Sequence, residues 1–261
     1  MAARLPVVFC AHGNPMNALR QNGFTRFLKA WRSHLPRPRA LLAVSAHWES
    51  ATLTLTAAPR PETLHDFHGF PQQLHEVRYN AQGAPDVAQR VQELLGAAGF
   101  ETRAYWQQGL DHGVWAPLVH LYPEADIPIA QLSLLAGAPL ARHLEIGHAL
   151  AALRGEGVLI LCSGNLVHNL STADLSRENH TPEPWALAVD VWIKDQLDHW
   201  RTEALARIHE ALPEGRKAHP SLEHYAPLLV ACGAAGPRPA VSYPYEGFEH
   251  GTISMRCVKF D

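Results

Sequence analysis

Three short apolar segments of this chain are each followed by a histidine close to the point where the segment ends. The segments are residues 5–9, 40–45 and 157–162, and the histidines that follow them are His12, His47 and His168. Continuous apolar runs of this length are typical of strands that are covered on both faces of a sheet. Because ligands of open α/β sheets bind outside the carboxyl ends of the strands, we expect the three histidines to converge at one edge of a sheet.

The segments between and after these runs predict the other elements. Apolar residues keep helical spacing over residues 87–98, 140–151 and 184–212, so we expect a helix in each range. Residues 127–135 predict a further strand. Residues 252–260 predict a C-terminal strand at or near an edge of the sheet, because Arg256 and Lys259 interrupt its apolar pattern.

Length and composition indicate one domain. A chain of 261 residues, 47% of them hydrophobic, can bury one large core, and no Pro/Gly-rich linker divides it. Alternating strands and helices are typical of layered α/β folds. We therefore predict a single α/β domain over residues 1–261, with a central mostly parallel or mixed β-sheet flanked by helices on both faces.

Charge and cysteine usage exclude several classes of protein. The formal net charge is −3 and the Lys and Arg residues are scattered, so we expect no nucleic-acid partner. The sequence has no signal-peptide pattern and no apolar stretch of about eighteen residues, so we expect a cytoplasmic protein without membrane contact. The isolated cysteines, which lack metal or redox spacing, predict buried free thiols; they are Cys10, Cys162, Cys232 and Cys257.

The seventeen histidines carry the strongest functional signal. Neutral imidazole is the commonest side-chain metal ligand. The sequence lacks the motifs of zincins, serine hydrolases, P-loop enzymes and Rossmann dehydrogenases. The remaining candidate is a dispersed metal site in which His12, His47 and His224 hold one cation, with His168 and His112 nearby.

The contexts of these histidines resemble a known family, the class III extradiol ring-cleavage dioxygenases, and within it the 4,5-DOPA extradiol dioxygenase-like branch. The similarity covers nearly the whole chain in the same order. The motifs that carry it are Ala11-His12-Gly13, Ser45-Ala46-His47-Trp48, Asp66-Phe67, Gly69-Phe70-Pro71, Leu110-Asp111-His112-Gly113, Ser163-Gly164-Asn165, His168-Asn169-Leu170, Glu223-His224-Tyr225 and His250-Gly251-Thr252-Ile253-Ser254.

The resemblance implies a non-haem Fe(II) ion as the active metal, often replaced by Zn(II) in purified protein. It also implies a small-molecule catechol substrate of the 3,4-dihydroxyphenyl, DOPA-like type, whose ring is cleaved with O2. By the same resemblance, His12, His47 and His224 are metal ligands and His112 is a catalytic histidine that faces the substrate. His168 matches a position described either as a fourth metal ligand or as the catalytic acid/base.

The residue at position 224 differs in type from that of better-known relatives, and this difference affects the chemistry of the site. Those enzymes have a glutamate at the position of His224, whereas here Glu223 is the neighbouring residue. Neighbours on a helix point about 100° apart, since the helix has about 3.6 residues per turn, so we expect Glu223 and His224 not to bind the same ion. Three neutral imidazoles would leave a divalent ion its full charge, which favours an anionic catecholate and also suits zinc.

Two other functions use the same histidines. A zinc-dependent hydrolase would activate water at an open position of the metal, and a non-catalytic zinc-binding protein would close the site with four histidines. For assembly, we expect a monomer or a small homo-oligomer.

Several further residues have alternative interpretations. His219 fits a helix start or a substrate contact, and Trp48 and Trp115 fit the core or a stacking wall for an aromatic ring. Residues 65–71 predict a loop at the pocket mouth. The remaining histidines in helix-like or polar stretches predict solvated or packing positions; they are His34, His75, His120, His143, His180, His199 and His209.

Overall fold

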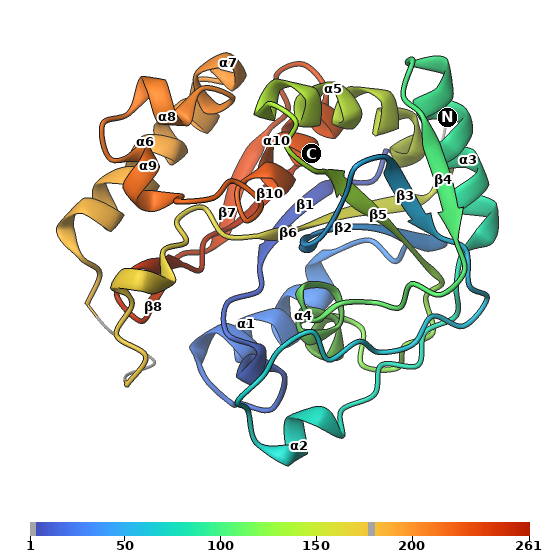
Figure 1. The fold of residues 1–261 in the computed structure, drawn as a ribbon, viewed down its shortest axis with the longest axis horizontal. Helices are drawn as coiled ribbons and strands as arrows, with labels where there is room; N and C mark the ends of the chain where they lie inside the picture. The colour runs from blue at the N-terminus through green and yellow to red at the C-terminus, as the bar shows by residue number, and fades with distance from the viewer. Residues whose placement is uncertain (1–3, 177–180) are drawn as a thin grey trace.

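The structure, a computed structural model, describes residues 4–176 and 181–261. Its strands are β1 (Val7–Ala11), β2 (Ala40–Ser50), β3 (Leu53–Thr56), β4 (Thr102–Tyr105), β5 (Ile129–Leu135), β6 (Val158–Gly164), β7 (Val241–Tyr245), β8 (Phe248–Glu249), β9 (Ile253–Ser254) and β10 (Cys257–Phe260). Eight of them form one sheet in the order β4-β3-β5-β2-β6-β1-β10-β7, and β8 pairs with β9 in a separate hairpin. The sheet crosses the middle of the molecule (Figure 1).

The centre of the sheet is parallel. Strand β2 pairs in parallel with both β5 and β6, and β1 pairs in parallel with β6. Antiparallel pairs occur between β3 and β5 and on the other side, where β10 joins β1 to β7. The predicted mostly parallel or mixed sheet is confirmed, and each of the three apolar runs followed by a histidine forms one of its central strands.

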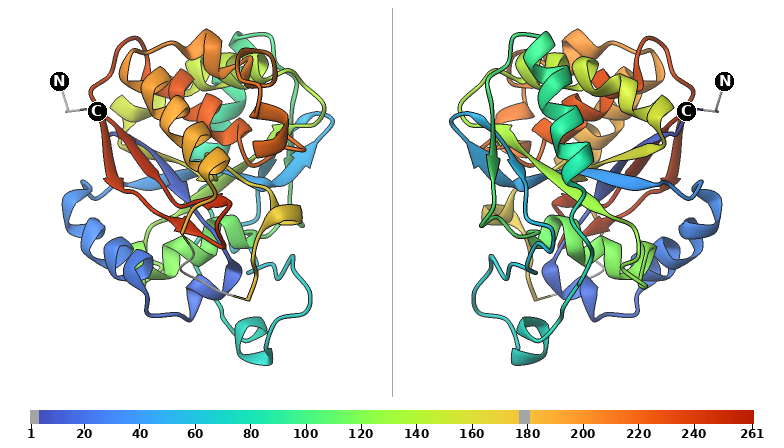
Figure 2. Two further views of the ribbon diagram at one scale, coloured as in Figure 1. Left: turned by 90° about the vertical axis from the view of Figure 1, so that its left-hand side faces the viewer. Right: turned by 90° about the vertical axis from the view of Figure 1, so that its right-hand side faces the viewer.

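Helices cover both faces of this sheet (Figure 2). They are α1 (Gly23–Trp31), α2 (Gln72–His75), α3 (Pro85–Ala97), α4 (His112–Leu121), α5 (Leu140–Leu150), α6 (Pro184–Asp198), α7 (Thr202–Leu205), α8 (Ile208–Ala211), α9 (Gly215–Ala218) and α10 (Ala226–Ala235), with short 3-10 helices at Pro15–Ala18, Arg32–His34, Ala151–Glu156 and Leu170–Thr172. Helices α3, α5, α6 and α10 share one hydrophobic cluster with the sheet, and α1 and α4 share the other.

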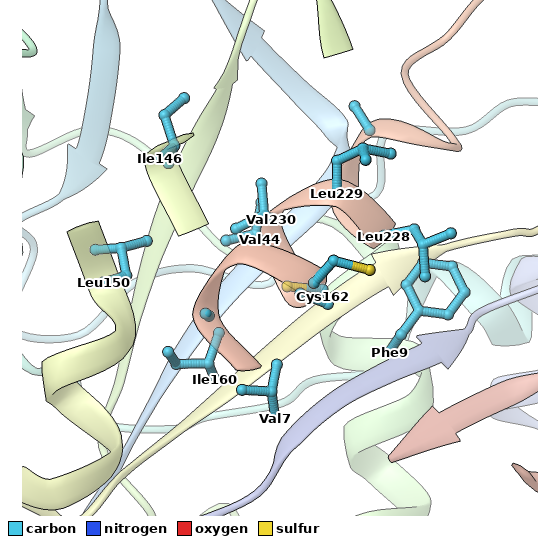
Figure 3. Packing of buried hydrophobic residues seen from close by; sticks show 14 of the residues in the cluster. Val7, Phe9, Val44, Ile146, Leu150, Ile160, Cys162, Leu228, Leu229 and Val230 are labelled. Atoms are coloured by element: carbon cyan, nitrogen blue, oxygen red, sulfur yellow. The ribbon is translucent and has the colours of Figure 1, made fainter. Parts of the chain in front are cut away.

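Successive residues of the central strands enter opposite clusters. In β2, Leu42 and Val44 pack on the side of α10, whereas Leu41 and Ala43 pack on the side of α4. Figure 3 shows the first of these layers, with α10 lying across β1, β2 and β6. Because both faces are buried, these strands need apolar residues at every position, which is why they read as continuous apolar runs.

Two glycines allow α5 and α10 to touch. A Cβ atom on Gly147 would lie 2.1 Å from the carbonyl oxygen of Val230, and one on Gly233 would lie 2.1 Å from that of Leu144. The helix backbones therefore cross in direct contact, without side chains between them. This contact matters for function because α10 begins two residues after His224.

Two sequence expectations differ from the structure. The helix expected over residues 184–212 is wrong in its extent, because α6 ends at Asp198 and the short α7 and α8 follow. The break coincides with Trp200, whose backbone has φ 52°, a left-handed value that a continuous helix cannot contain. The strand expected over residues 252–260 is divided into β9 and β10, whereas its expected place near an edge is confirmed, because β10 lies one strand in from the edge.

Within the described part of the chain, no helix has the length and apolar composition that a membrane span requires.

The close crossing of α5 and α10 generates a stability prediction. We expect Gly147→Ala to lower the free energy of unfolding by about 1–3 kcal/mol, because the added methyl group forces the two backbones apart. The matched control is Gly96→Ala in exposed α3, where a Cβ meets nothing within 4 Å and alanine should stabilise by about 0.5–1 kcal/mol. Urea denaturation measures both; a Gly147→Ala protein as stable as the wild type would contradict the assigned contact.

Candidate active site

A pocket of about 310 Å³ opens where the central strands end. His12 directly follows β1, His47 lies in the last part of β2, and His168 follows β6, and all three line the pocket. His112, the first residue of α4, and His224, just before α10, complete a set of five histidines. Residues 65–71 are a loop, as expected, and three of its members border the pocket; they are Asp66, Phe67 and Phe70.

Three of the histidines could hold one metal ion. Ligand atoms of His12, His47 and His224 all lie within 4.8 Å of one another. The Nε2 atoms of His12 and His47 are 3.0 Å apart. Three imidazole nitrogens converging in this way form a donor set that suits Fe(II), Zn(II) and similar divalent ions.

Hydrogen bonds on the far side of two of these rings orient their Nε2 lone pairs. The Ser163 hydroxyl donates to the carbonyl of Gly113 at 2.5 Å, so its oxygen accepts the bond from Nδ1 of His12 at 3.0 Å. The Glu223 carboxylate accepts from Nδ1 of His224 at 2.9 Å. With the proton on Nδ1, each neutral ring presents an unprotonated Nε2, which is the form that ligates metals.

Burial keeps these rings neutral. It holds the pKa of His12 and of His224 well below the usual value, and the positive fields of neighbouring histidines lower both further. Burial, assisted by the field of His112, lowers the pKa of His47 to about 3. A cation therefore meets ligands that need no deprotonation at neutral pH.

His112 is held by a carboxylate from the pocket loop. Its backbone N–H donates to Oδ1 of Asp66 and its Nδ1 donates to Oδ2, both at 2.9 Å. Burial acts to raise the pKa of Asp66, but the hydrogen bonds from His112 outweigh it and hold that pKa below its usual value. The ionised carboxylate keeps the proton on Nδ1, so Nε2 of His112 is the acceptor.

His168 lies against the candidate ligand His224. Its ring stacks on that of His224 with centroids 3.5 Å apart and planes 5° from parallel. Its ligand atom groups with those of Glu223 and His224, not with those of His12 and His47. Burial lowers the pKa of His168 to about 4, so this ring is also neutral at pH 7.

The helix expected at Glu223 and His224 is wrong. The two residues lie in the turn before α10, not on a helix. Freed from helical geometry, the Glu223 side chain folds back onto the ring of its neighbour. The structure therefore shows Glu223 as a hydrogen-bond partner of His224.

The end of β6 positions this turn. The Asn165 N–H donates to the carbonyl of His224 at 2.9 Å. A Cβ on Gly164 would lie 2.2 Å from that same oxygen, so only glycine permits the approach. The Ser163-Gly164-Asn165 motif thus supports His12 through its first residue and the backbone of His224 through the other two.

Comparisons with known proteins agree with this arrangement. Residues 5–255 match the family described as the catalytic LigB subunit of aromatic ring-opening dioxygenase. The chain belongs to this LigB family. A 4,5-DOPA dioxygenase extradiol of Escherichia coli K12 is 41% identical over 99% of this chain and 95% of its own length, and one of Beta vulgaris is 37% identical over 97% and 95%. A crystal structure of an uncharacterized protein from Escherichia coli K12 superposes with a TM-score of 0.85 at 38% identity, covering 99% of this chain and all of the other.

Membership of the LigB family confirms the predicted resemblance to extradiol ring-opening dioxygenases, and it does not favour the hydrolase and non-catalytic alternatives.

Burial and contacts decide the alternative interpretations of Trp48, Trp115 and His219. Trp115 is fully buried and donates to the carbonyl of Leu64, so it belongs to the core, and Trp48 borders a separate surface hollow. His219 is also fully buried and its Nε2 bonds to the carbonyl of Leu166, so its role is structural.

The other histidines divide between surface and interior. His34 and His199 are exposed, whereas His120 and His143 are buried. His180 lies outside the described residues. The four cysteines are buried free thiols, as predicted.

Sequence reasoning missed the residues that hold the histidines from behind. Asp66, Ser163 and Glu223 each accept a hydrogen bond from Nδ1 of one of the five pocket histidines. In the sequence, only their positions next to a histidine or at a strand end could have indicated this role. It also gave no role to His250, which lines the same pocket. These contacts join residues up to 151 positions apart, so periodicity could not reveal them.

The buried neutral histidines predict acid lability. Burial lowers the pKa of His219 to about 3, so between pH 6.5 and that value only the unfolded state takes up the proton, and stability falls as the pH falls. Each such group contributes about 1.4 kcal/mol per pH unit. In metal-free protein we expect His219→Gln, whose amide can still donate to Leu166, to reduce this slope by about that amount between pH 6 and 4. Urea denaturation at several pH values measures it, and an unchanged slope would contradict the assignment.

Proposed function

We propose that this protein cleaves the ring of a catechol substrate with O2, using a non-haem Fe(II) ion held by Nε2 of His12, His47 and His224. The observation that carries the proposal is the convergence of three buried neutral imidazoles in one pocket, with ligand atoms within 4.8 Å of one another. Zn(II) fits the same nitrogens and is expected in purified protein. The ion, when bound, would supply the one-electron chemistry that O2 requires and would acidify a catechol hydroxyl.

His112 is proposed to bind and orient the substrate. Its Nδ1 is committed to Asp66, so Nε2 accepts a hydrogen bond from a catechol hydroxyl. The carboxylate behind the ring stabilises the imidazolium that forms when a proton arrives. Asp66 thus acts through His112 as a positioning residue.

His168 is proposed as the acid/base group rather than as a fourth ligand. The rings of His168 and His224 stack in parallel with centroids 3.5 Å apart, so their in-plane lone pairs lie in separate planes and do not converge on one atom. Burial holds its pKa at about 4, so the ring is a free base ready to take a proton from the substrate. The same ring can return that proton to the product.

The pocket walls suit a single aromatic ring with a substituent. Beyond the histidines, the lining is largely apolar and includes Phe67, Phe70, Leu170, Leu175 and Ile253. A volume of about 310 Å³ is at the small end of ligand pockets. Relatives named 4,5-DOPA dioxygenase extradiol support a 3,4-dihydroxyphenyl substrate of the DOPA type.

The ligand assignment is tested by metal binding. We expect His224→Ala to lose bound metal, because one of three donors is removed. Glu223→Leu should keep the three donors but weaken metal affinity about 10–100-fold, because the ring of His224 is no longer oriented from behind. Competition with a chromogenic chelator measures both affinities.

The matched control is Glu49→Leu, which removes a nearby exposed carboxylate that bonds to none of the histidines. This variant should bind metal like the wild type. If Glu223→Leu and Glu49→Leu lose metal affinity equally, Glu223 acts only through its negative charge and not by orienting His224. Unchanged metal affinity in His224→Ala would overturn the ligand set.

The reaction is tested by anaerobic loading with Fe(II), followed by addition of a catechol and O2. We expect stoichiometric O2 uptake with formation of a yellow ring-opened product, and no turnover after loading with Zn(II). His168→Ala should lower kcat by about 10²–10⁴-fold with a much smaller change in KM, because it removes proton transfer rather than binding. Loss of iron from His168→Ala would instead identify this residue as a ligand, and absence of O2 uptake with every catechol would refute the proposed reaction.

A further inference from the structure

His250 is a buried polar residue of the pocket that the proposed chemistry leaves without a role. It occupies the turn of the hairpin formed by β8 and β9, borders the pocket, and is 4% exposed. Its backbone has φ 54°, a left-handed conformation that is uncommon for residues other than glycine. A strained residue of this kind at a ligand pocket points to a functional reason for its retention.

Contacts with one neighbouring segment define the orientation of the ring. Nδ1 of His250 bonds to the carbonyl of Asp174 at 3.0 Å, and the Asp174 N–H donates to the carbonyl of His250 at 3.0 Å. A carbonyl oxygen can only accept, so Nδ1 carries a proton. In the neutral ring, Nε2 is then an acceptor.

Nε2 of His250 has no hydrogen-bond partner among the described residues, although it is buried. An unpaired buried acceptor is costly, and native structures rarely retain one unless water or a ligand completes it. The ring borders the pocket, and Nδ1 is already bonded to Asp174. Nε2 is therefore the polar atom that His250 can offer to a pocket ligand.

His250 is not part of the network of ring contacts among the five site histidines. The five site histidines are linked by ring contacts with centroids from 3.5 to 5.5 Å apart, and the described ring contacts do not include His250. Its hydrogen-bonded neighbour Asp174 instead precedes Leu175, an exposed apolar residue of the pocket lining. His250 thus borders the pocket beside the segment that carries Leu175.

We propose that Nε2 of His250 accepts a hydrogen bond from an N–H or O–H group on the ring substituent of the substrate, and so determines which catechols this site prefers. The inference rests on the proposed function, and it adds a substrate class: catechols whose side chain carries a hydrogen-bond donor. A substituent without a donor would leave the buried acceptor unpaired, and a site built in this way discriminates against such analogues.

Three catechols of similar shape test this role: 4-(2-aminoethyl)catechol, 4-(2-hydroxyethyl)catechol and 4-ethylcatechol. Their dissociation constants are measured by calorimetry with the zinc-loaded protein, and kcat/KM with the iron-loaded protein. The test variant is His250→Asn. Asparagine tolerates left-handed φ, and its amide can keep the bond to the Asp174 carbonyl in place of Nδ1, but it has no atom at the position of Nε2.

The wild type should bind the two donor-bearing catechols about three- to tenfold more tightly than 4-ethylcatechol. His250→Asn should abolish this preference while leaving the affinity for 4-ethylcatechol within about twofold. A preference for the amine alone would identify the donor as an ammonium group, and equal preferences would extend it to hydroxyl groups. A second variant, His250→Gly, relieves the backbone strain and should lose the preference in the same way.

An equal affinity of the wild type for all three catechols would overturn the inference, as would an unchanged preference in both variants. Failure of the proposed function is distinguishable, because it would abolish O2 uptake by iron-loaded protein but leave the binding measurements intact. If none of the three catechols binds to the zinc-loaded wild type, the inference about His250 fails, whereas the proposed function is still decided by O2 uptake.

Discussion

The hydrogen bond from the backbone N–H of Asn165 to the carbonyl of His224 is the contact on which the site depends. It attaches the turn before α10 to the end of β6, and Gly164 allows the approach because any side chain would collide with the same carbonyl. Helix α10 then packs across the parallel strands and is held against α5 through glycine contacts. Without this attachment, His224 would have no reason to lie beside histidines more than 170 residues earlier in the chain.

Near this contact, the histidine rings are buried in the neutral form, and hydrogen bonds fix which nitrogen carries the proton. Burial alone would leave each ring neutral but free to exchange its proton between two nitrogens. Ser163, Asp66 and Glu223 remove that freedom for three rings by accepting from Nδ1. The result is a set of lone pairs aimed into one pocket, which is favourable only where a cation or a substrate hydroxyl completes them.

The secondary structure was predictable where the residues are buried on both sides. Strands β1, β2 and β6 contain continuous apolar runs, whereas β4 and β7 are edge strands whose side chains are partly or fully exposed, so no such run marks them. Strand β7 also contains Pro244. Proline is tolerated in an edge strand, but in a sequence it weakens the prediction of a strand. Helix α6 was recognised, but its end at a left-handed Trp200 has no periodic signal.

The sequence by itself determined the α/β architecture and the residue types available for chemistry, because apolar periodicity and the order of strand and histidine are local properties of the chain. It also identified the five histidines, through their resemblance to the extradiol dioxygenases. Only the tertiary structure decided that Nε2 is the free nitrogen of His12, His112 and His224, that Glu223 supports its neighbour, and that His250 presents an unpaired acceptor. These outcomes depend on hydrogen bonds between distant segments and on turn conformations, and such contacts exist only after the sheet and its helices have packed.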